Sequence, residues 1–170
     1  MCNPRQGERG FMSHKIRVSS RAIIINDDKI LLNCFGGGLY FNFPGGGIEE
    51  NETAKQAVER EVLEETGLTV RVGDLVFSLE YEPVSCDYLY GKSHHISFFF
   101  RCYLRCDVPA QTPSEIDINP NNPSITPEAK WLPLSDLAHL NIVPKVNGPL
   151  MEYIKTGFFA PSFWAECERL

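Results

Sequence analysis

The segment 46–68 joins a glycine-rich start to a dense set of acidic side chains, and reads GGIEENETAKQAVEREVLEETGL. Glu64 and Glu65 follow Glu61 by three and four residues, so in a helix each of them repels Glu61 by about 0.2–0.5 kcal/mol. Two of the three, Glu64 and Glu65, also lie in the last turn, where the helix dipole disfavours negative charge. A sequence that accepts both penalties indicates a bound cation.

The chemistry of these ligands selects the cation. Oxygen-only ligands favour a hard ion, Mg²⁺ or Mn²⁺, which keeps several waters and binds through a few carboxylates together with the phosphates of a substrate. The ordinary alternative for such a set of carboxylates is a solvated acidic helix face. Gly46, Glu52 and Arg60, at matching offsets upstream, favour the metal site.

The whole motif resembles the signature of the Nudix hydrolases at every defining position, and the pattern of flanking strands extends the resemblance over about residues 17–140. The resemblance implies an α/β fold, a Nudix-type α/β/α sandwich with a mixed β-sheet. It also implies a hydrolase that cleaves a nucleoside diphosphate linked to another moiety, by attack of water on phosphorus. The defining positions are Gly46, Glu52, Arg60, Glu61, Val62, Glu64, Glu65, Gly67 and Leu68.

The resemblance also implies roles for the acidic residues. Glu61 and Glu65 are implied as the principal metal ligands, Glu64 as a direct or water-mediated ligand, and the Gly46 carbonyl as a further one. We expect Glu64 or Glu61 to be the general base, because water on a divalent ion is more acidic and needs less basic help.

The remaining site candidates lie around the motif. Arg60 is implied to pair with Glu52 and to hold the loop against the helix, so both count among the catalytic residues. Gly45 and Gly47 permit a close approach of backbone to metal or phosphate, although a structural turn is the ordinary alternative. Further candidates for substrate binding are Pro83, His95, Glu128 and Trp131.

Length and composition indicate a single catalytic domain. Of the 170 residues, we assign 1–15 to a flexible tail, 16–156 to the Nudix domain, and 157–170 to an aromatic segment that packs on the domain or on a partner subunit, which makes a homodimer plausible. The net charge of −6 argues against general binding to nucleic acid or to anionic membranes.

The cysteines and the apolar runs bear on the compartment. The six cysteines include no Cys-x-x-Cys pair, which favours buried or incidental thiols. Apolar runs are far shorter than the 18 or so residues that span a bilayer, and the first residues lack an apolar signal core. We therefore expect a cytoplasmic, reducing location and no membrane.

Turn residues and apolar periodicity predict the elements that position the motif. The segments 36–38, 44–47 and 83–93 are expected to be loops, and 107–127 a lid or a surface insertion. We expect strands over 16–25, 29–34, 40–43, 69–80 and 95–104, the first two joined in a hairpin by the turn residues 26–28, and a short strand from Trp131. Helices are expected over 53–66, with a capping box from Thr53 to Gln56 and a left-handed end at Gly67, from Ser135 to Leu140 and from Asn147.

Two classes of function remain at this point. The first is a metal-dependent pyrophosphohydrolase acting on ADP-ribose or a related nucleotide sugar, and next on a modified nucleoside triphosphate. Pro83 lies at an offset beyond the motif that is associated in the Nudix family with ADP-ribose hydrolysis. The second is a non-catalytic nucleotide or sugar sensor that uses the same fold for binding. The complete carboxylate set favours catalysis.

Overall fold

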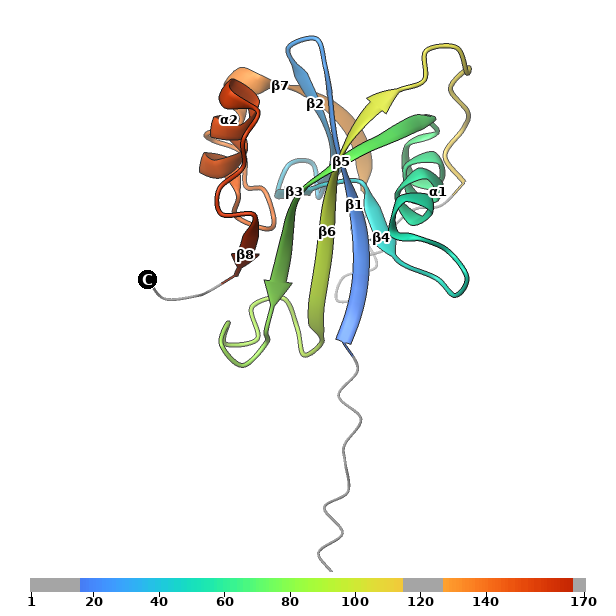
Figure 1. Cartoon of the computed structure of the whole chain (residues 1–170). Helices are drawn as coiled ribbons and strands as arrows, with labels where there is room; N and C mark the ends of the chain where they lie inside the picture. Colours follow the sequence, from blue (N-terminus) through green and yellow to red (C-terminus); the bar gives the residue numbers. More distant parts are fainter. Residues whose placement is uncertain (1–15, 115–126, 167–170) are drawn as a thin grey trace, which may run out of the picture.

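The computed structural model describes residues 16–114 and 127–166, in which one mixed sheet lies between two helices. Figure 1 shows α1 and α2 on opposite sides of that sheet, which confirms the predicted α/β sandwich. The elements are β1 (Ile16–Asn26), β2 (Lys29–Phe35), β3 (Tyr40–Asn42), β4 (Gly45–Gly47), α1 (Ala54–Thr66), β5 (Val70–Tyr81), β6 (His94–Leu104), β7 (Glu128–Pro133), the 3-10 turn η1 (Leu134–Asp136), α2 (Asn147–Thr156) and β8 (Phe163–Ala165).

The strands run in the order β3-β2-β1-β6-β5-β8, with β4 paired to β1 and β7 to β2. The pairs β1–β6 and β5–β8 are parallel, and the other pairs are antiparallel. The sheet is therefore mixed, as predicted. The predicted hairpin between β1 and β2 is present and turns at Asp27 and Asp28.

Alternation along β1 divides its side chains between two cores. Ile23 packs in the cluster on the α2 side, whereas Ala22 and Ile24 pack in the cluster on the α1 side. Arg17 and Arg21 are an even number of residues from Ile23, so they share its face of the sheet. The first half of β1 thus presents charged groups on the face that its second half uses for the core.

The helix α1 begins and ends where its sequence predicts. Thr53 is the N-cap and forms the predicted capping box with Gln56, and Gly67 ends the helix in the left-handed conformation at φ 71°. Val58 and Val62 are fully buried against the sheet. Burial of that stripe leaves the acidic stripe beside β4.

The glycines after Pro44 form a strand and not the predicted turn. Gly45–Gly47 pairs antiparallel with β1, so that Gly46 lies opposite Ser20. A Cβ at Gly45 would collide with the Ser20 carbonyl oxygen, and the φ of 137° at Gly45 also favours glycine. Local sequence indicated flexibility here, but the pairing with β1 gives these residues an extended backbone.

Two predictions in the second half of the chain are wrong in their bounds. The helix expected from Ser135 to Leu140 is only the turn η1, because the Ser135 hydroxyl donates to Asp136 and caps no backbone amide. The strand expected from Trp131 begins at Glu128, because β7 pairs with β2 from there onward. The predicted second helix from Asn147 is confirmed as α2.

The end of the chain packs on the sheet as far as it is described. Strand β8 pairs with β5, and Phe159 is buried with its ring stacked on Phe77 at 4.0 Å. Phe158 and Phe163 are exposed. The predicted tail 1–15 and most of the predicted lid lie outside the described residues.

Cys86 departs from the prediction that the cysteines are buried or incidental thiols. It is buried and disulfide-bonded. A disulfide depends on the spatial separation of two Cα atoms, which sequence spacing does not report. Cys34, Cys102 and Cys106 are free, and burial raises the pKa of the Cys102 thiol to about 12. Among the described residues, no helix has both the length and the apolarity to cross a membrane.

Candidate active site

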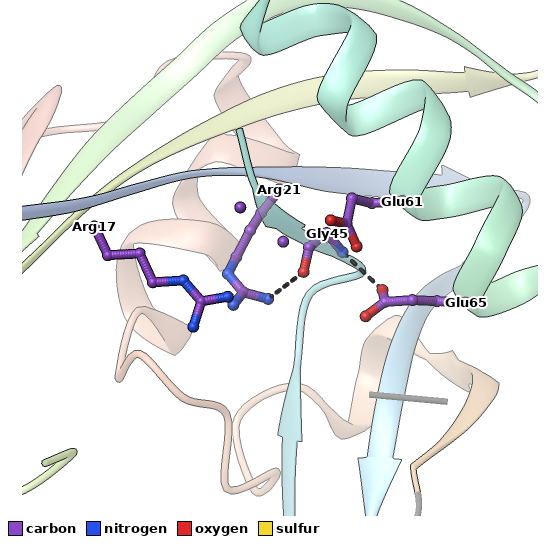
Figure 2. A pocket seen from close by; sticks show the side chains of 7 residues that line it. Arg17, Arg21, Gly45, Glu61 and Glu65 are labelled. Carbon is purple, nitrogen blue, oxygen red and sulfur yellow. Dashed lines mark hydrogen bonds between the residues drawn. The ribbon is translucent and has the colours of Figure 1, made fainter. Parts of the chain in front are cut away.

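A cavity of about 170 Å³ opens where β1, β4 and the C-terminal half of α1 meet. Figure 2 shows that two arginines reach it from β1 and two glutamates from α1, with the glycine strand between them. Its lining residues are Arg17, Arg21, Gly45, Gly46, Gly47, Glu61 and Glu65.

The cationic wall consists of Arg17 and Arg21, which share one face of β1. The Arg21 guanidinium donates from Nη1 to the carbonyl oxygens of Phe43 at 2.8 Å and Gly45 at 3.0 Å. These bonds orient the guanidinium along the glycine strand. Arginine presents several donors in a planar fork that matches phosphate oxygens, so this wall suits an anionic ligand.

The acidic wall consists of Glu61 and Glu65, one helical turn apart on α1. The Glu61 side chain is 14% exposed, and burial raises its carboxyl pKa even though Arg60 opposes that shift. Gly46 lies directly against it, because a Cβ added to Gly46 would collide with the Glu61 carboxylate. Only a glycine leaves room for this carboxylate beside β4.

One residue, Gly45, orients both walls. The Gly45 amide donates to Glu65 Oε2 at 2.8 Å, and the Gly45 carbonyl accepts from Arg21 at 3.0 Å. The dashed lines in Figure 2 follow these two bonds across β4. Pairing of β4 with β1 therefore determines how the arginines and the carboxylates face each other.

Arg60 holds the loop and two carboxylates beside the cavity. Its guanidinium donates to Glu52 Oε1 at 2.7 Å, Glu61 Oε1 at 2.9 Å, Glu64 Oε2 at 3.0 Å and the Gly47 carbonyl at 3.0 Å. The predicted pair with Glu52 is thus confirmed. The hydrogen bond to Glu52 raises the pKa of Arg60, and the same contact lowers the pKa of Glu52.

The carboxylates fit a hard divalent ion that completes its coordination with water and substrate. Among the described residues, no three His, Cys, Asp or Glu side chains form a group that could hold a metal ion by themselves. Glu64 bonds to Arg60 and is not part of the cavity lining. Glu61 and Glu65 line the cavity with the backbone of Gly46, a donor set that suits Mg²⁺ or Mn²⁺ with a substrate phosphate.

None of the four other predicted substrate residues lines the cavity. His95 pairs in register with Arg17, and burial followed by the charges of Arg17 and Arg21 lowers its pKa. Pro83 is buried in the turn after β5.

The remaining two residues, Glu128 and Trp131, are both in β7. Glu128 is exposed and forms an ion pair with Lys130 at 3.0 Å, so its carboxylate is directed to a neighbour on its own strand. Trp131 is partly buried and packs against the cluster on the α1 side. Its ring therefore fills part of the core and does not line the cavity.

Sequence analysis missed the two arginines of the cavity. Arg17 and Arg21 interrupt an apolar strand and, at a spacing of four, fall on the same face of it. Alternation alone therefore contained a signal for a charged half-face. The sequence did not show that these two arginines meet carboxylates of α1, because α1 follows β1 by three further strands.

Comparison with known proteins identifies the family of the chain. The NUDIX domain family model matches residues 15–153. An RNA pyrophosphohydrolase of Erythrobacter litoralis is 32% identical over 114 residues, which are 61% of this chain and 65% of the relative. The chain thus spans a little less than two thirds of the length of that relative.

Solved structures share the fold. A NUDIX hydrolase from Nitrosomonas europaea superposes with a TM-score of 0.64 at 23% identity, over 85% of this chain and 92% of that one. An ADP-ribose pyrophosphatase from Streptococcus suis superposes with a TM-score of 0.57 at 21% identity, over 88% of this chain and 98% of that one. Since the family model spans most of its length and includes the complete acidic motif, the chain belongs to the NUDIX domain family.

Proposed function

We propose that the chain is a divalent-metal-dependent pyrophosphohydrolase that cleaves a nucleoside diphosphate linked to another moiety, by attack of water on phosphorus. The observation that supports it is the cavity in which Glu61 and Glu65 face Arg17 and Arg21 across β4. Phosphoryl transfer depends mainly on positioning and on stabilisation of phosphate charge. The two walls supply complementary charges for that purpose.

The residues divide the work between the walls. Arg17 and Arg21 bind phosphate oxygens of the substrate through charge-assisted hydrogen bonds. Glu61 and Glu65, with the Gly46 carbonyl, would hold Mg²⁺ or Mn²⁺. When bound, the ion neutralises phosphate charge and lowers the pKa of a coordinated water.

We assign the role of general base, which accepts the proton of the attacking water, to Glu61 or Glu64. Arg60 Nη1 bonds to both carboxylates, at 2.9 and 3.0 Å, and so fixes them side by side at the edge of the cavity. Glu52 holds the far side of the same guanidinium and connects it to the loop before α1. Arg60 and Glu52 therefore orient the acidic residues.

For the substrate we propose ADP-ribose or a related nucleotide sugar first, and a modified nucleoside triphosphate second. A structure with the same fold is called an ADP-ribose pyrophosphatase. In the sequence, Pro83 lies at the offset beyond the motif that the family resemblance associates with ADP-ribose hydrolysis. The Erythrobacter relative is named for RNA, but the net charge of −6 disfavours a polyanion here.

The test is phosphate or nucleotide release from nucleotide sugars, dinucleotides and oxidised nucleoside triphosphates, each with Mg²⁺, Mn²⁺ or a chelator. We expect release from one class, abolished by the chelator. Absence of release from every compound, together with a ligand-induced rise in melting temperature, would contradict catalysis and favour the sensor.

The variant Glu65→Gln tests the acidic wall. It keeps the size of the side chain and removes its charge, and we expect kcat/KM at saturating Mg²⁺ to fall by about 100-fold or more, since loss of even an indirect metal contact costs 10–100-fold. Glu59→Gln, an exposed change on the same helix, is the matched control and is expected to retain activity. Full turnover by Glu65→Gln would refute the mechanism.

A further inference from the structure

Asn33 is a polar residue inside a buried strand. It lies in β2, where it is 2% exposed and flanked by the buried Leu32 and Cys34. A buried carboxamide destabilises the fold unless its groups are hydrogen-bonded. The neighbours of Asn33 along β2 are buried and apolar, so its hydrogen bonds are the feature that distinguishes it.

The Asn33 amide reaches the acidic wall of the cavity. Its Nδ2 donates to Glu65 Oε2 at 3.0 Å, and the Gly45 amide donates to the same oxygen at 2.8 Å. The two donors come from different strands, β2 and β4, and converge on one carboxylate oxygen of α1. A glutamate side chain rotates about three bonds, and two donors from separate rigid elements restrict that rotation.

Glu65 accepts hydrogen bonds from Asn33 and the Gly45 amide, which its neighbours on the helix do not share. Glu61 and Glu64 bond to the Arg60 guanidinium, whose positive charge competes with a metal ion for the same carboxylates. Asn33 and the Gly45 amide are neutral donors, so these two bonds orient the Glu65 carboxylate without adding a positive charge beside it.

We propose, on the basis of the metal-dependent function proposed above, that Asn33 is a positioning residue whose side-chain amide orients the Glu65 carboxylate for the divalent ion. It acts through Glu65 and contacts neither substrate nor the reacting phosphorus. Metal ligands are commonly oriented in this way by hydrogen bonds from residues that do not touch the metal. No part of the 46–68 motif includes Asn33, which precedes it in the chain.

The test measures Mn²⁺ binding by the loss of the free-ion signal in electron paramagnetic resonance, without substrate. Asn33→Leu removes the donor at similar volume, and we expect its Kd for Mn²⁺ to rise about 10–100-fold. Asn42→Leu is the matched control, since Asn42 is the cross-strand partner of Asn33 and its Oδ1 has no hydrogen-bond partner in the described structure. We expect Asn42→Leu to bind Mn²⁺ within about twofold of the wild type.

A double variant separates positioning from general damage to the fold. In a Glu65→Gln background, Asn33→Leu is expected to change the Kd by less than about twofold, because the charged target of the amide is gone. An effect as large as in the wild-type background would overturn the proposal. Circular dichroism verifies folding, and Asn33→Ala replaces Asn33→Leu in both backgrounds if the latter does not fold.

Hydrolysis assays on the same proteins distinguish failure of this proposal from failure of the proposed function. If the wild type hydrolyses a nucleotide with metal but Asn33→Leu keeps its Mn²⁺ affinity, positioning by Asn33 is refuted and the function stands. If the wild type hydrolyses nothing yet Asn33→Leu weakens Mn²⁺ binding through Glu65, positioning stands and catalysis fails. Absence of Mn²⁺ binding by a wild type that also hydrolyses no nucleotide would overturn both.

Discussion

At the scale of single residues, Arg60 modifies the argument that led from the acidic helix to a cation. Repulsion among Glu61, Glu64 and Glu65 indicates that a positive charge relieves it, and a divalent ion is one such charge. The structure shows that Arg60 relieves part of it, through bonds of 2.9 and 3.0 Å to Glu61 and Glu64. Glu65 accepts hydrogen bonds from Asn33 and the Gly45 amide. Relief of the repulsion therefore does not by itself require a metal ion.

Arg17 tests the cationic wall. Loss of a charge-assisted hydrogen bond costs about 1.5–3 kcal/mol, so Arg17→Ala is expected to raise KM for the hydrolysed nucleotide about 10–100-fold. Arg71→Ala removes an exposed arginine that lies over the Tyr103 ring, away from the cavity, and is expected to leave KM unchanged. Steady-state kinetics of the two variants compares them. Equal KM values for Arg17→Ala and Arg71→Ala would show that Arg17 does not bind the nucleotide.

His95 makes stability depend on pH. Burial and the nearby Arg17 and Arg21 hold its folded pKa below the ordinary value of 6.5, so the unfolded chain binds the proton more readily. Above pH 6.5 the imidazole is neutral in both states and adds no pH dependence. As the pH falls from 6.5 through the folded pKa, the free energy of unfolding decreases. Melting temperatures from pH 7.5 to 5 are expected to fall more steeply for the wild type than for His95→Gln. Parallel curves would contradict the depressed pKa.

At the scale of elements, β4 connects the two charged walls. It is three residues long, and its pairing with β1 places the amide and the carbonyl of Gly45 between Arg21 and Glu65. The strand is made of glycine because neighbouring groups occupy the side-chain positions: Ser20 at Gly45 and Glu61 at Gly46. The geometry of the site thus depends on strand pairing as much as on the helix.

Gly46→Ala tests this role of β4. The new Cβ would occupy the position of the Glu61 carboxylate and displace it, and a displacement of about 1 Å in an active site costs on the order of 100-fold in rate. Gly148→Ala makes the same change where a Cβ meets no atom within 4 Å, and is expected to keep full activity. Nucleotide hydrolysis and melting temperature are measured for both. Full activity of a folded Gly46→Ala protein would show that Glu61 tolerates displacement.

At the scale of the whole molecule, the last described residues form part of the core on the α2 side of the sheet. The Phe77 ring lies between Phe99 at 4.2 Å and Phe159 at 4.0 Å, with all three rings nearly parallel. Phe159 is 3% exposed, although it follows α2 in a segment that the family model does not match. Packing therefore connects the stability of the central sheet to residues beyond the family model.

Phe159→Ala tests that connection. Removal of a buried phenylalanine ring typically costs about 3–5 kcal/mol in the free energy of unfolding. Phe158→Ala is the matched control, because Phe158 is 70% exposed, and changes at such surface positions usually stay within about 0.5 kcal/mol. Urea denaturation of both variants gives the comparison. Similar midpoints would show that the aromatic segment adds little to the core.

The sequence alone determined the features that arise from local rules. The helix over 53–66 was predicted with its cap at Thr53 and its end at Gly67, because capping and left-handed termination depend on adjacent residues. The long strands on either side followed from apolar and β-branched runs. The acidic motif predicted a metal site, and its resemblance to the Nudix signature implied the Arg60–Glu52 pair that the structure contains.

Tertiary structure decided which distant residues meet. Arg17 and Arg21 reach the cavity only because β4 pairs with β1, and Asn33 meets Glu65 only because the fold brings together two residues 32 positions apart in the chain. Strand pairing also made a strand of the glycines that local sequence predicted as a turn. Contacts between residues far apart in the chain depend on sheet order and register, and no pattern within a single segment of sequence reports these.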